Sequence, residues 1–347
     1  MSRISEYDIT STSSEAGRLL TPGKSSVREV VDADPRLVRL VFTYAAFAVF
    51  WLVFGTLVGE LLGLKFVWPE FAELRWLSFG RLRPVHTNTV FWGWGSLGML
   101  SLAHYVLPRT SRTELYSYRL GWWALGLINA SVLLGTIQLV GGVNNGAQEY
   151  REFVWPVMAV FGLGLVLCAV NFYRTIAERN TDAIYISNWY ILGALLWTTT
   201  LATVAYLPGY QSGMGQTIIQ GYYMHQGVGM WFTPMVLGLT YYSLPKLLNK
   251  PIYSYALGIL AFWTQLIFYT MIGSHHFVFS PIPWWIQTVA IVFSIGMVVP
   301  VVAGTANFAL TARGSRGEVR RSYALPFLLV GILFYLLGSL QEIGRAS

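Results

Sequence analysis

The chain has 347 residues, of which 54% are hydrophobic and only 11% are charged. Soluble domains carry about 25% charged residues, so this composition excludes a large soluble domain and indicates an integral membrane protein. The net charge of +7 does not indicate nucleic-acid binding, because Lys and Arg in membrane proteins gather in cytoplasmic loops. The single cysteine, Cys168, lies inside an apolar run, where we expect a buried thiol without a disulfide partner.

Residues 1–36 are rich in Ser, Thr and charge and have no apolar core of signal-peptide type, so we expect a cytoplasmic tail. Apolar runs of membrane length then follow up to residue 341, and they predict an all-α bundle of nine transmembrane helices. Residues 342–347 are expected to form a short divergent tail, and no internal repeat is expected. The predicted spans lie near 38–62, 85–107, 121–142, 154–173, 187–208, 218–244, 253–276, 284–311 and 323–341.

The distribution of Lys and Arg predicts the orientation of these spans. With the N-terminus in the cytoplasm, seventeen Lys and Arg residues lie in inner segments and five lie in outer loops. Positive charge concentrates on the cytoplasmic side, which favours this orientation. It places His86, His225, His275 and His276 in the outer third of the membrane, and His104 at the inner end of the second span, where we expect an interfacial histidine.

Two adjacent histidines, His275 and His276, end one apolar run. Polar side chains are rare inside a membrane and usually functional, and a metal ion is a natural partner for several neutral imidazoles. Neighbouring helical residues point about 100° apart, so the pair reaches one ion only near a helix end, which Pro281 and Pro283 predict. With His225 from the preceding run, the pair predicts a three-histidine metal site with an open coordination position. The pattern does not choose between copper, zinc and iron.

Other polar residues suit cofactor chemistry or ordinary packing. Tyr269 lies two helical turns before His276, where its phenol could donate a proton and an electron to a metal site or simply pack. His86 follows Arg83 by three residues, as an axial haem ligand would follow an arginine that binds a haem propionate. The alternative is an interfacial histidine beside a loop arginine.

An acidic pair, Glu149 and Glu152, lies in an outer loop and either binds a hard cation such as calcium or is solvated loop charge. No Asp or Glu lies well inside a predicted span. A proton route would therefore use hydroxyl groups and water. The candidate hydroxyls are those of Thr240, Tyr241, Tyr242 and Thr264.

These residues lie in motifs that resemble subunit I of the haem-copper oxygen reductases, specifically the C-family or cbb-three type. The matching motifs are Phe79-Gly-Arg-Leu-Arg-Pro-Val-His86-Thr-Asn, Glu149-Tyr-x-Glu152-x-x-Trp-Pro, His225-x-x-Val-Gly, Tyr241-Tyr-x-x-Pro-Lys246, Pro251-Ile-Tyr-Ser-Tyr and Tyr269-x5-His275-His276. The resemblance extends from about residue 35 to Gln341. It implies that residues 37–341 form nine of the family's twelve transmembrane helices.

The resemblance also implies cofactors and residue roles. The implied cofactors are a low-spin haem b, a high-spin haem b and a copper ion, with calcium as a further possibility. The implied roles are copper ligation for His225, His275 and His276, a catalytic and cross-linked tyrosine for Tyr269, axial ligation of the low-spin haem for His86, propionate binding for Arg83, and calcium binding for Glu149 with support from Glu152.

The implied reaction is the reduction of dioxygen to water, coupled to proton uptake and pumping, in a bacterial inner membrane. Electrons would come from cytochrome c through membrane-anchored c-type cytochrome subunits. The family carries a His-x-His pair on its tenth helix that completes both haem sites, whereas the five histidines of this chain contain no such pair. We therefore expect this chain alone to ligate neither haem fully and to be inactive by itself, as a fragment, a frameshifted product or half of a split protein.

Three alternatives remain at this stage. A nitric oxide reductase of the same superfamily uses iron in place of copper and needs a glutamate near the metal, but Gln226 follows His225 and Tyr269 is present. A non-catalytic fragment or assembly paralogue would keep the bundle without turnover. A channel or transporter predicts a polar lining along a whole pathway rather than histidines at one depth.

Overall fold

The computed structural model describes residues 34–146, 148–207 and 212–346. The predicted N-terminal tail, apart from its last three residues, lies outside the described part. The described residues fall into two compact units. We call residues 34–181 and 191–236 the N-terminal unit and the rest of the described chain the C-terminal unit, and we describe each by itself.

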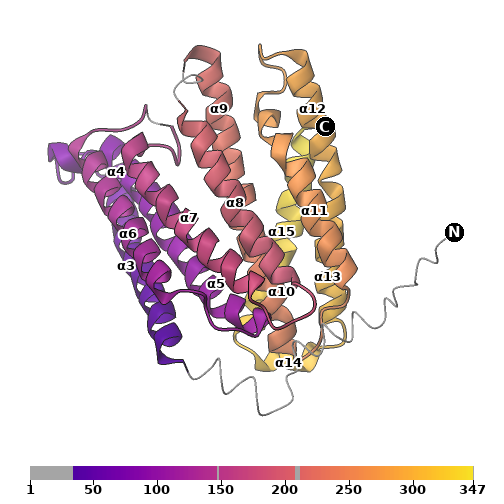
Figure 1. Cartoon of the computed structure of the whole chain (residues 1–347). Helices are drawn as coiled ribbons and strands as arrows, with labels where there is room; N and C mark the ends of the chain where they lie inside the picture. Colours follow the sequence, from indigo (N-terminus) through magenta and orange to yellow (C-terminus); the bar gives the residue numbers. More distant parts are fainter. Residues whose placement is uncertain (1–33, 147, 208–211, 347) are drawn as a thin grey trace. The chain divides into compact units, whose positions relative to one another are not determined.

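The described chain is built from helices joined by short loops, which confirms the predicted all-α class (Figure 1). The helices are α3 (Pro35–Val67), η1 (Arg75–Leu77), α4 (Phe79–Asn88), η2 (Thr89–Gly95), α5 (Ser96–Ser111), α6 (Tyr118–Gly141), α7 (Trp155–Ala177), α8 (Ile186–Tyr206), α9 (Gly213–Gln226), η4 (Gly227–Phe232), α10 (Thr233–Leu248), α11 (Tyr255–Ile272), η5 (Gly273–Phe277), α12 (Trp284–Gly296), α13 (Val298–Ala312), α14 (Arg316–Arg321) and α15 (Ala324–Ala346).

Seven helical stretches of the described chain are long and apolar enough to cross a membrane. The other two predicted spans, near 85–107 and 218–244, fall on helices that π-helical turns divide into pieces of at most 16 residues. The number nine therefore stays a prediction, and so does the orientation. The seven candidate spans are Pro35–Val67, Tyr118–Gly141, Trp155–Ala177, Ile186–Tyr206, Tyr255–Phe277, Trp284–Ala312 and Ala324–Gly344.

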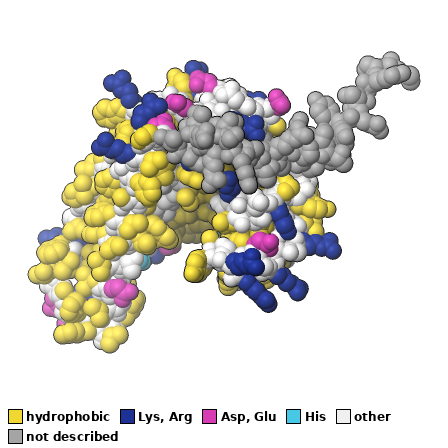
Figure 2. Space-filling view, turned by 90° about the horizontal axis from the view of Figure 1, so that it is seen from below, with side chains coloured by type: hydrophobic (Ala, Val, Ile, Leu, Met, Phe, Trp, Pro, Cys, Tyr) yellow, Lys and Arg dark blue, Asp and Glu magenta, His cyan; other side chains and the backbone are white. Residues whose placement is uncertain are grey.

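The surface suits a lipid environment. Hydrophobic side chains cover broad areas of the face drawn in Figure 2, and Lys and Arg gather in separate clusters. Large apolar side chains such as Phe42 and Phe334 are about two-thirds exposed, at 70% and 67%. In water this much exposed apolar surface would cause aggregation, whereas in a bilayer it contacts lipid.

Within the N-terminal unit, α6 packs along α7, and α3 packs against α5 and η2. Asp34 is the N-cap of α3, the first helix of this unit. Its Oδ1 accepts a hydrogen bond from the backbone N–H of Arg36 at 2.9 Å. Tyr118 at the start of α6 also donates its hydroxyl to Asp34. Partial burial opposes ionisation of Asp34, but the hydrogen bonds from Arg36 and Tyr118 outweigh it and lower the pKa of the carboxyl from 3.8 to about 2.

We expect Asp34→Ala to lower the free energy of unfolding by about 0.5–2 kcal/mol at neutral pH, because an N-cap and the link to α6 are lost. A lowered pKa contributes stability that is fully present above 3.8 and is lost as pH falls through about 2. The difference in melting temperature between wild type and Asp34→Ala should therefore shrink as pH falls through that window. Asp182→Ala, at an exposed loop position, is the matched control. A difference that stays constant with pH would contradict this account.

Each unit contains the same helix-capping arrangement. In the N-terminal unit the backbone N–H of Ser117 donates to Asn171 Oδ1 at 2.9 Å, and Asn171 Nδ2 donates back to the Ser117 carbonyl at 3.0 Å. In the C-terminal unit Ser254 and Asn307 repeat both bonds, at 2.9 and 2.8 Å. The expectation of no internal repeat is therefore wrong.

The repeat extends into the core of each unit. In the N-terminal unit the ring of His104 lies 4.7 Å from both Tyr44 and Phe172. Tyr241 holds the corresponding place in the C-terminal unit, 5.4 Å from Tyr190 and 4.5 Å from Phe308. His104 is fully buried and its Nδ1 bonds the Leu100 carbonyl at 2.8 Å, so the prediction of an interfacial histidine is also wrong. As predicted, Cys168 is buried and free.

Candidate metal and cofactor site

The adjacent histidines lie where a helix changes its geometry. The α-helix α11 ends at Ile272, and both histidines fall in the tighter 3-10 turn η5, which confirms the predicted helix end. The rings of His275 and His276 lie 4.5 Å apart at 85°. Perpendicular rings on a tight turn can point their nitrogens at one position, which adjacent residues of a regular α-helix cannot do.

The tautomer of His275 is set by Ser294 on α12, a residue that the sequence analysis did not identify. Ser294 Oγ donates its proton to the Ala290 carbonyl at 2.8 Å and therefore accepts from His275 Nδ1 at 3.0 Å. With Nδ1 protonated, Nε2 of His275 carries the lone pair that a metal requires. Ser294 and His275 are both buried.

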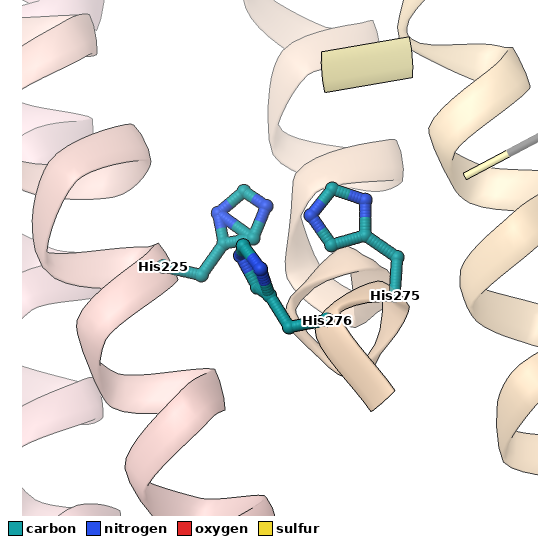
Figure 3. Close-up of side chains that lie close together, drawn as sticks. All are labelled: His225, His275 and His276. Carbon is teal, nitrogen blue, oxygen red and sulfur yellow. The ribbon is translucent and has the colours of Figure 1, made fainter. Parts of the chain in front are cut away.

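The predicted third ligand, His225, belongs to the N-terminal unit, whereas His275 and His276 belong to the C-terminal unit. Figure 3 draws the three side chains. His225 belongs to the last turn of α9, directly before the π-helical turn η4. Neutral imidazoles suit copper, zinc and iron alike, so the donor set fits a copper ion without selecting it. The role of the three as ligands stays a prediction.

His86 is oriented in the same manner within the N-terminal unit. It lies on α4, and its Nδ1 donates to the Gly55 carbonyl of α3 at 2.7 Å. A carbonyl only accepts, so Nε2 is again left as the ligand atom, as an axial haem ligand requires. The close approach depends on Gly59, where a Cβ would come within 2.7 Å of His86 Cε1.

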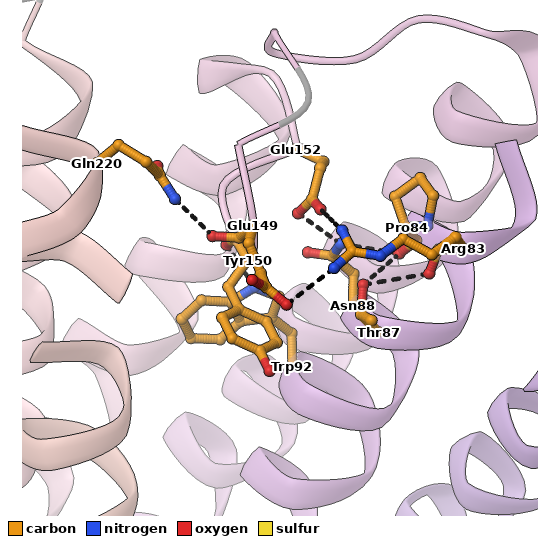
Figure 4. A network of polar contacts seen from close by, with 9 residues as sticks. All are labelled: Arg83, Pro84, Thr87, Asn88, Trp92, Glu149, Tyr150, Glu152 and Gln220. Atoms are coloured by element: carbon orange, nitrogen blue, oxygen red, sulfur yellow. Dashed lines mark hydrogen bonds and ion pairs between the residues drawn. The ribbon is translucent and has the colours of Figure 1, made fainter. Parts of the chain in front are cut away.

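Arg83 forms ion pairs with the two carboxylates of the loop between α6 and α7 (Figure 4). Its Nη2 lies 3.0 Å from Glu149 Oε1, and its Nη1 lies 3.9 Å from Glu152 Oε1. Asn88 donates to the other oxygen of Glu152 at 2.8 Å. Burial raises the pKa of the Glu152 carboxyl, and Asn88 and Arg83 only partly oppose this rise. Asn88 is a second residue that the sequence analysis missed.

The remaining candidates lie on helices of the C-terminal unit. Tyr269 lies on α11 and packs against a small apolar cluster formed by Ile272, Met297 and Val301. Tyr241 is fully buried on α10, and Tyr242 is 9% exposed. The Tyr241 carbonyl accepts from the Tyr185 hydroxyl at 2.8 Å. These positions do not test a catalytic role for Tyr269 or a proton route through the other two.

Comparison with known proteins places this arrangement in a family. Residues 39–343 match the family described as Cytochrome C and Quinol oxidase polypeptide I. The chain is 32% identical over 311 residues to the Cbb3-type cytochrome c oxidase subunit CcoN1 of Stutzerimonas stutzeri, with 86% of this chain and 65% of that protein covered. It is 31% identical over 298 residues to the cytochrome c oxidase subunit 1 homologue of Agrobacterium tumefaciens, with 83% and 55% covered.

The fold comparison agrees with the sequence comparison. A solved haem-copper terminal oxidase dimer matches with a TM-score of 0.69 at 16% identity, over 90% of this chain and 62% of that one. The chain is thus a polytopic helical membrane protein with a candidate metal centre. It belongs to the haem-copper oxidase subunit I family and spans just over half to about two-thirds of the length of the curated relatives named above.

Proposed function

We propose that this protein is the catalytic subunit of a terminal respiratory oxidase of the cbb3 type, which reduces dioxygen to water with electrons from cytochrome c. The observation that carries the proposal is the His275–His276 pair on its 3-10 turn, with Ser294 leaving Nε2 of His275 as a ligand atom. Family membership supports it, because curated relatives are named cytochrome c oxidase subunits.

Within this proposal His225, His275 and His276 hold copper, and His86 holds a low-spin haem b. When bound, the copper ion and a high-spin haem b would supply the binding place for dioxygen and pass on to it the electrons that come from cytochrome c. Tyr269 donates a proton and an electron from α11, and its phenol is cross-linked to His225. Tyr241 and Tyr242 contribute hydroxyls to the proton route.

The network around Arg83 has a role in the same proposal. Arg83 binds a haem propionate, which as an anion would share the guanidinium with the two outer-loop carboxylates. Glu149, 37% exposed, binds calcium, and the buried Glu152 supports it. The partners are membrane-anchored c-type cytochrome subunits, and the location is a bacterial inner membrane.

The experiment that tests the proposed function measures metal content and gas consumption of the protein purified from the membranes that produce it. In a complex that supplies the remaining haem ligands, we expect copper together with haem b, and oxygen consumption with reduced cytochrome c that yields water without peroxide; the chain by itself should show neither a full haem spectrum nor this activity. The residues that follow His225, from Gln226 to Trp231, include no Asp or Glu, which favours oxygen over nitric oxide as the substrate. Non-haem iron in place of copper, with consumption of nitric oxide, would identify a nitric oxide reductase instead. A protein without bound metal would indicate an assembly role.

Ser294→Ala should weaken copper binding about 10- to 100-fold, because the bond that fixes the ring of His275 is lost. Ser294→Thr, which keeps the hydroxyl, should bind copper like the wild type. Ser131→Ala is the matched control, since Ser131 is equally buried and bonds only the Val157 carbonyl at 2.7 Å. Copper titration of each purified variant gives the affinities. Equal copper affinity in Ser294→Ala and wild type would remove Ser294 from the site.

A further inference from the structure

Two π-helical turns divide the helices that carry His86 and His225. The turn η2 (Thr89–Gly95) begins three residues after His86, and η4 (Gly227–Phe232) begins two residues after His225. A π-helical turn inserts one extra residue into an α-helix, and such turns are rare and frequently found at functional sites. One extra residue rotates the part before the turn by about 100° relative to the part after it, so each turn sets the direction of the histidine before it.

The same side-chain bond closes both turns. Ser96 Oγ donates to the Phe91 carbonyl at 3.2 Å, and Thr233 Oγ1 donates to the Val228 carbonyl at 3.3 Å, each five residues back along the chain. A hydroxyl in a regular helix usually bonds the carbonyl four residues back instead, as Thr89 does with Val85 at 2.8 Å. The five-residue reach is thus matched to the wider turn, and it occurs directly after both turns.

The two turns also interlock within the N-terminal unit. Trp231 of η4 donates its Nε1 proton to Ser96 Oγ at 3.0 Å, and both residues are fully buried. The rings of Phe91 and Phe232 lie 4.4 Å apart. A Cβ on Gly95 would come within 2.5 Å of the Phe232 ring, so the contact requires a glycine. The Ser96 hydroxyl therefore donates a hydrogen bond within η2, to Phe91, and accepts one from Trp231 of η4.

A further bond ties these turns to the outer loop. Trp92 of η2 donates its Nε1 proton to the Tyr150 carbonyl at 3.1 Å, next to the carboxylates that pair with Arg83 (Figure 4). Tyr150 in turn stacks on Phe91, with ring centroids 4.2 Å apart. The paired turns thus contact the loop that faces the proposed haem propionate, in addition to the two helices that carry the ligand histidines.

We propose that the interlocked π-helical turns set the positions of the haem ligand His86 and the copper ligand His225, with Ser96 as the shared positioning residue. This inference rests on the proposed function, because the ligand roles come from it. Ser96 and Thr233 act through the direction of the helices that carry the ligands. A substitution of Ser96 should therefore alter the binding of both the haem and copper. A substitution of Thr233 should alter copper binding alone.

The test compares Ser96→Ala and Thr233→Val in the protein purified from the membranes that produce it. We expect Ser96→Ala to weaken copper binding about 10- to 100-fold and to convert part of the low-spin haem absorption to high-spin absorption. We expect Thr233→Val to weaken copper binding alone, and Thr233→Ser to restore it. Ser101→Ala is the control, because Ser101 is buried on the same helix as Ser96 and bonds only the Val41 carbonyl at 2.9 Å.

The outcomes separate this inference from the proposed function. A purely structural role for Ser96 predicts that Ser96→Ala and Ser101→Ala lower the melting temperature alike and leave haem spectrum and copper affinity unchanged. That result would overturn the inference if His86→Ala still removed the low-spin haem. If His86→Ala left the low-spin haem intact, the ligand assignment itself would be wrong, and the inference would fall with it.

Discussion

His275→Ala should remove bound copper from the purified protein. The variant loses the one histidine of the three whose tautomer is fixed by a buried serine, and two imidazoles from separate helical segments remain. Loss of an outer-shell partner costs about 10- to 100-fold in metal affinity, so loss of a ligand should cost more and reduce copper to background. Elemental analysis of wild type and variant, purified side by side, measures the effect.

The control for this result is His104→Gln. His104 is fully buried in the N-terminal unit and bonds the Leu100 carbonyl, so its replacement should lower stability and leave copper content unchanged. His225→Ala and His276→Ala should behave like His275→Ala. Normal copper content in any of these three variants would exclude that histidine as a ligand.

His86→Ala should abolish the low-spin haem absorption of the protein while the copper content stays that of the wild type. The imidazole is the proposed axial ligand, and its Nδ1 bond to the Gly55 carbonyl presents Nε2 for that purpose. Absorption spectra of the reduced protein, together with copper analysis, measure both parts of the expectation. A wild-type low-spin spectrum would show that the haem is held by other residues.

A pair of glycine variants tests the geometry without removing the ligand. Gly59→Ala places a Cβ within 2.7 Å of the His86 ring and should displace it, so the low-spin absorption should fall. Gly63→Ala, one turn further along α3, has open space around the added Cβ and should leave the spectrum unchanged. Identical spectra for the two variants would show that the ring of His86 is not held by α3.

The sequence identified residues better than it identified their contacts. Arg83, Glu149 and Glu152 were each singled out, yet the ion pairs among them depend on a loop and a helix more than sixty residues apart along the chain. The sequence did not indicate a role for Ser294, because a lone serine in an apolar helix ordinarily donates to a backbone carbonyl of the same helix. Ser294 also makes this bond, to the Ala290 carbonyl. Its bond to His275 follows only from the packing of α12 on η5.

The internal repeat is a second feature whose contacts the sequence did not predict. Its identities are confined to short turn motifs, Tyr116-Ser-Tyr118 and Tyr253-Ser-Tyr255, whereas the helices between them have diverged. Residues that hold equivalent places differ in chemistry, as His104 and Tyr241 do in the two cores. Equivalent backbone bonds are therefore visible in the structure and hidden in the sequence.

By itself the sequence determined the class of protein, because apolar runs of membrane length admit only helices whose backbone groups bond internally. It also determined the candidate ligand histidines, because imidazole is costly in an apolar segment unless it has a partner. The tertiary structure alone decided which nitrogen of His275 and of His86 is presented as a ligand atom, since that depends on the acceptor that packs behind each ring. It also decided where the helices widen into π-helical turns, which depends on buried bonds such as that from Trp231 to Ser96.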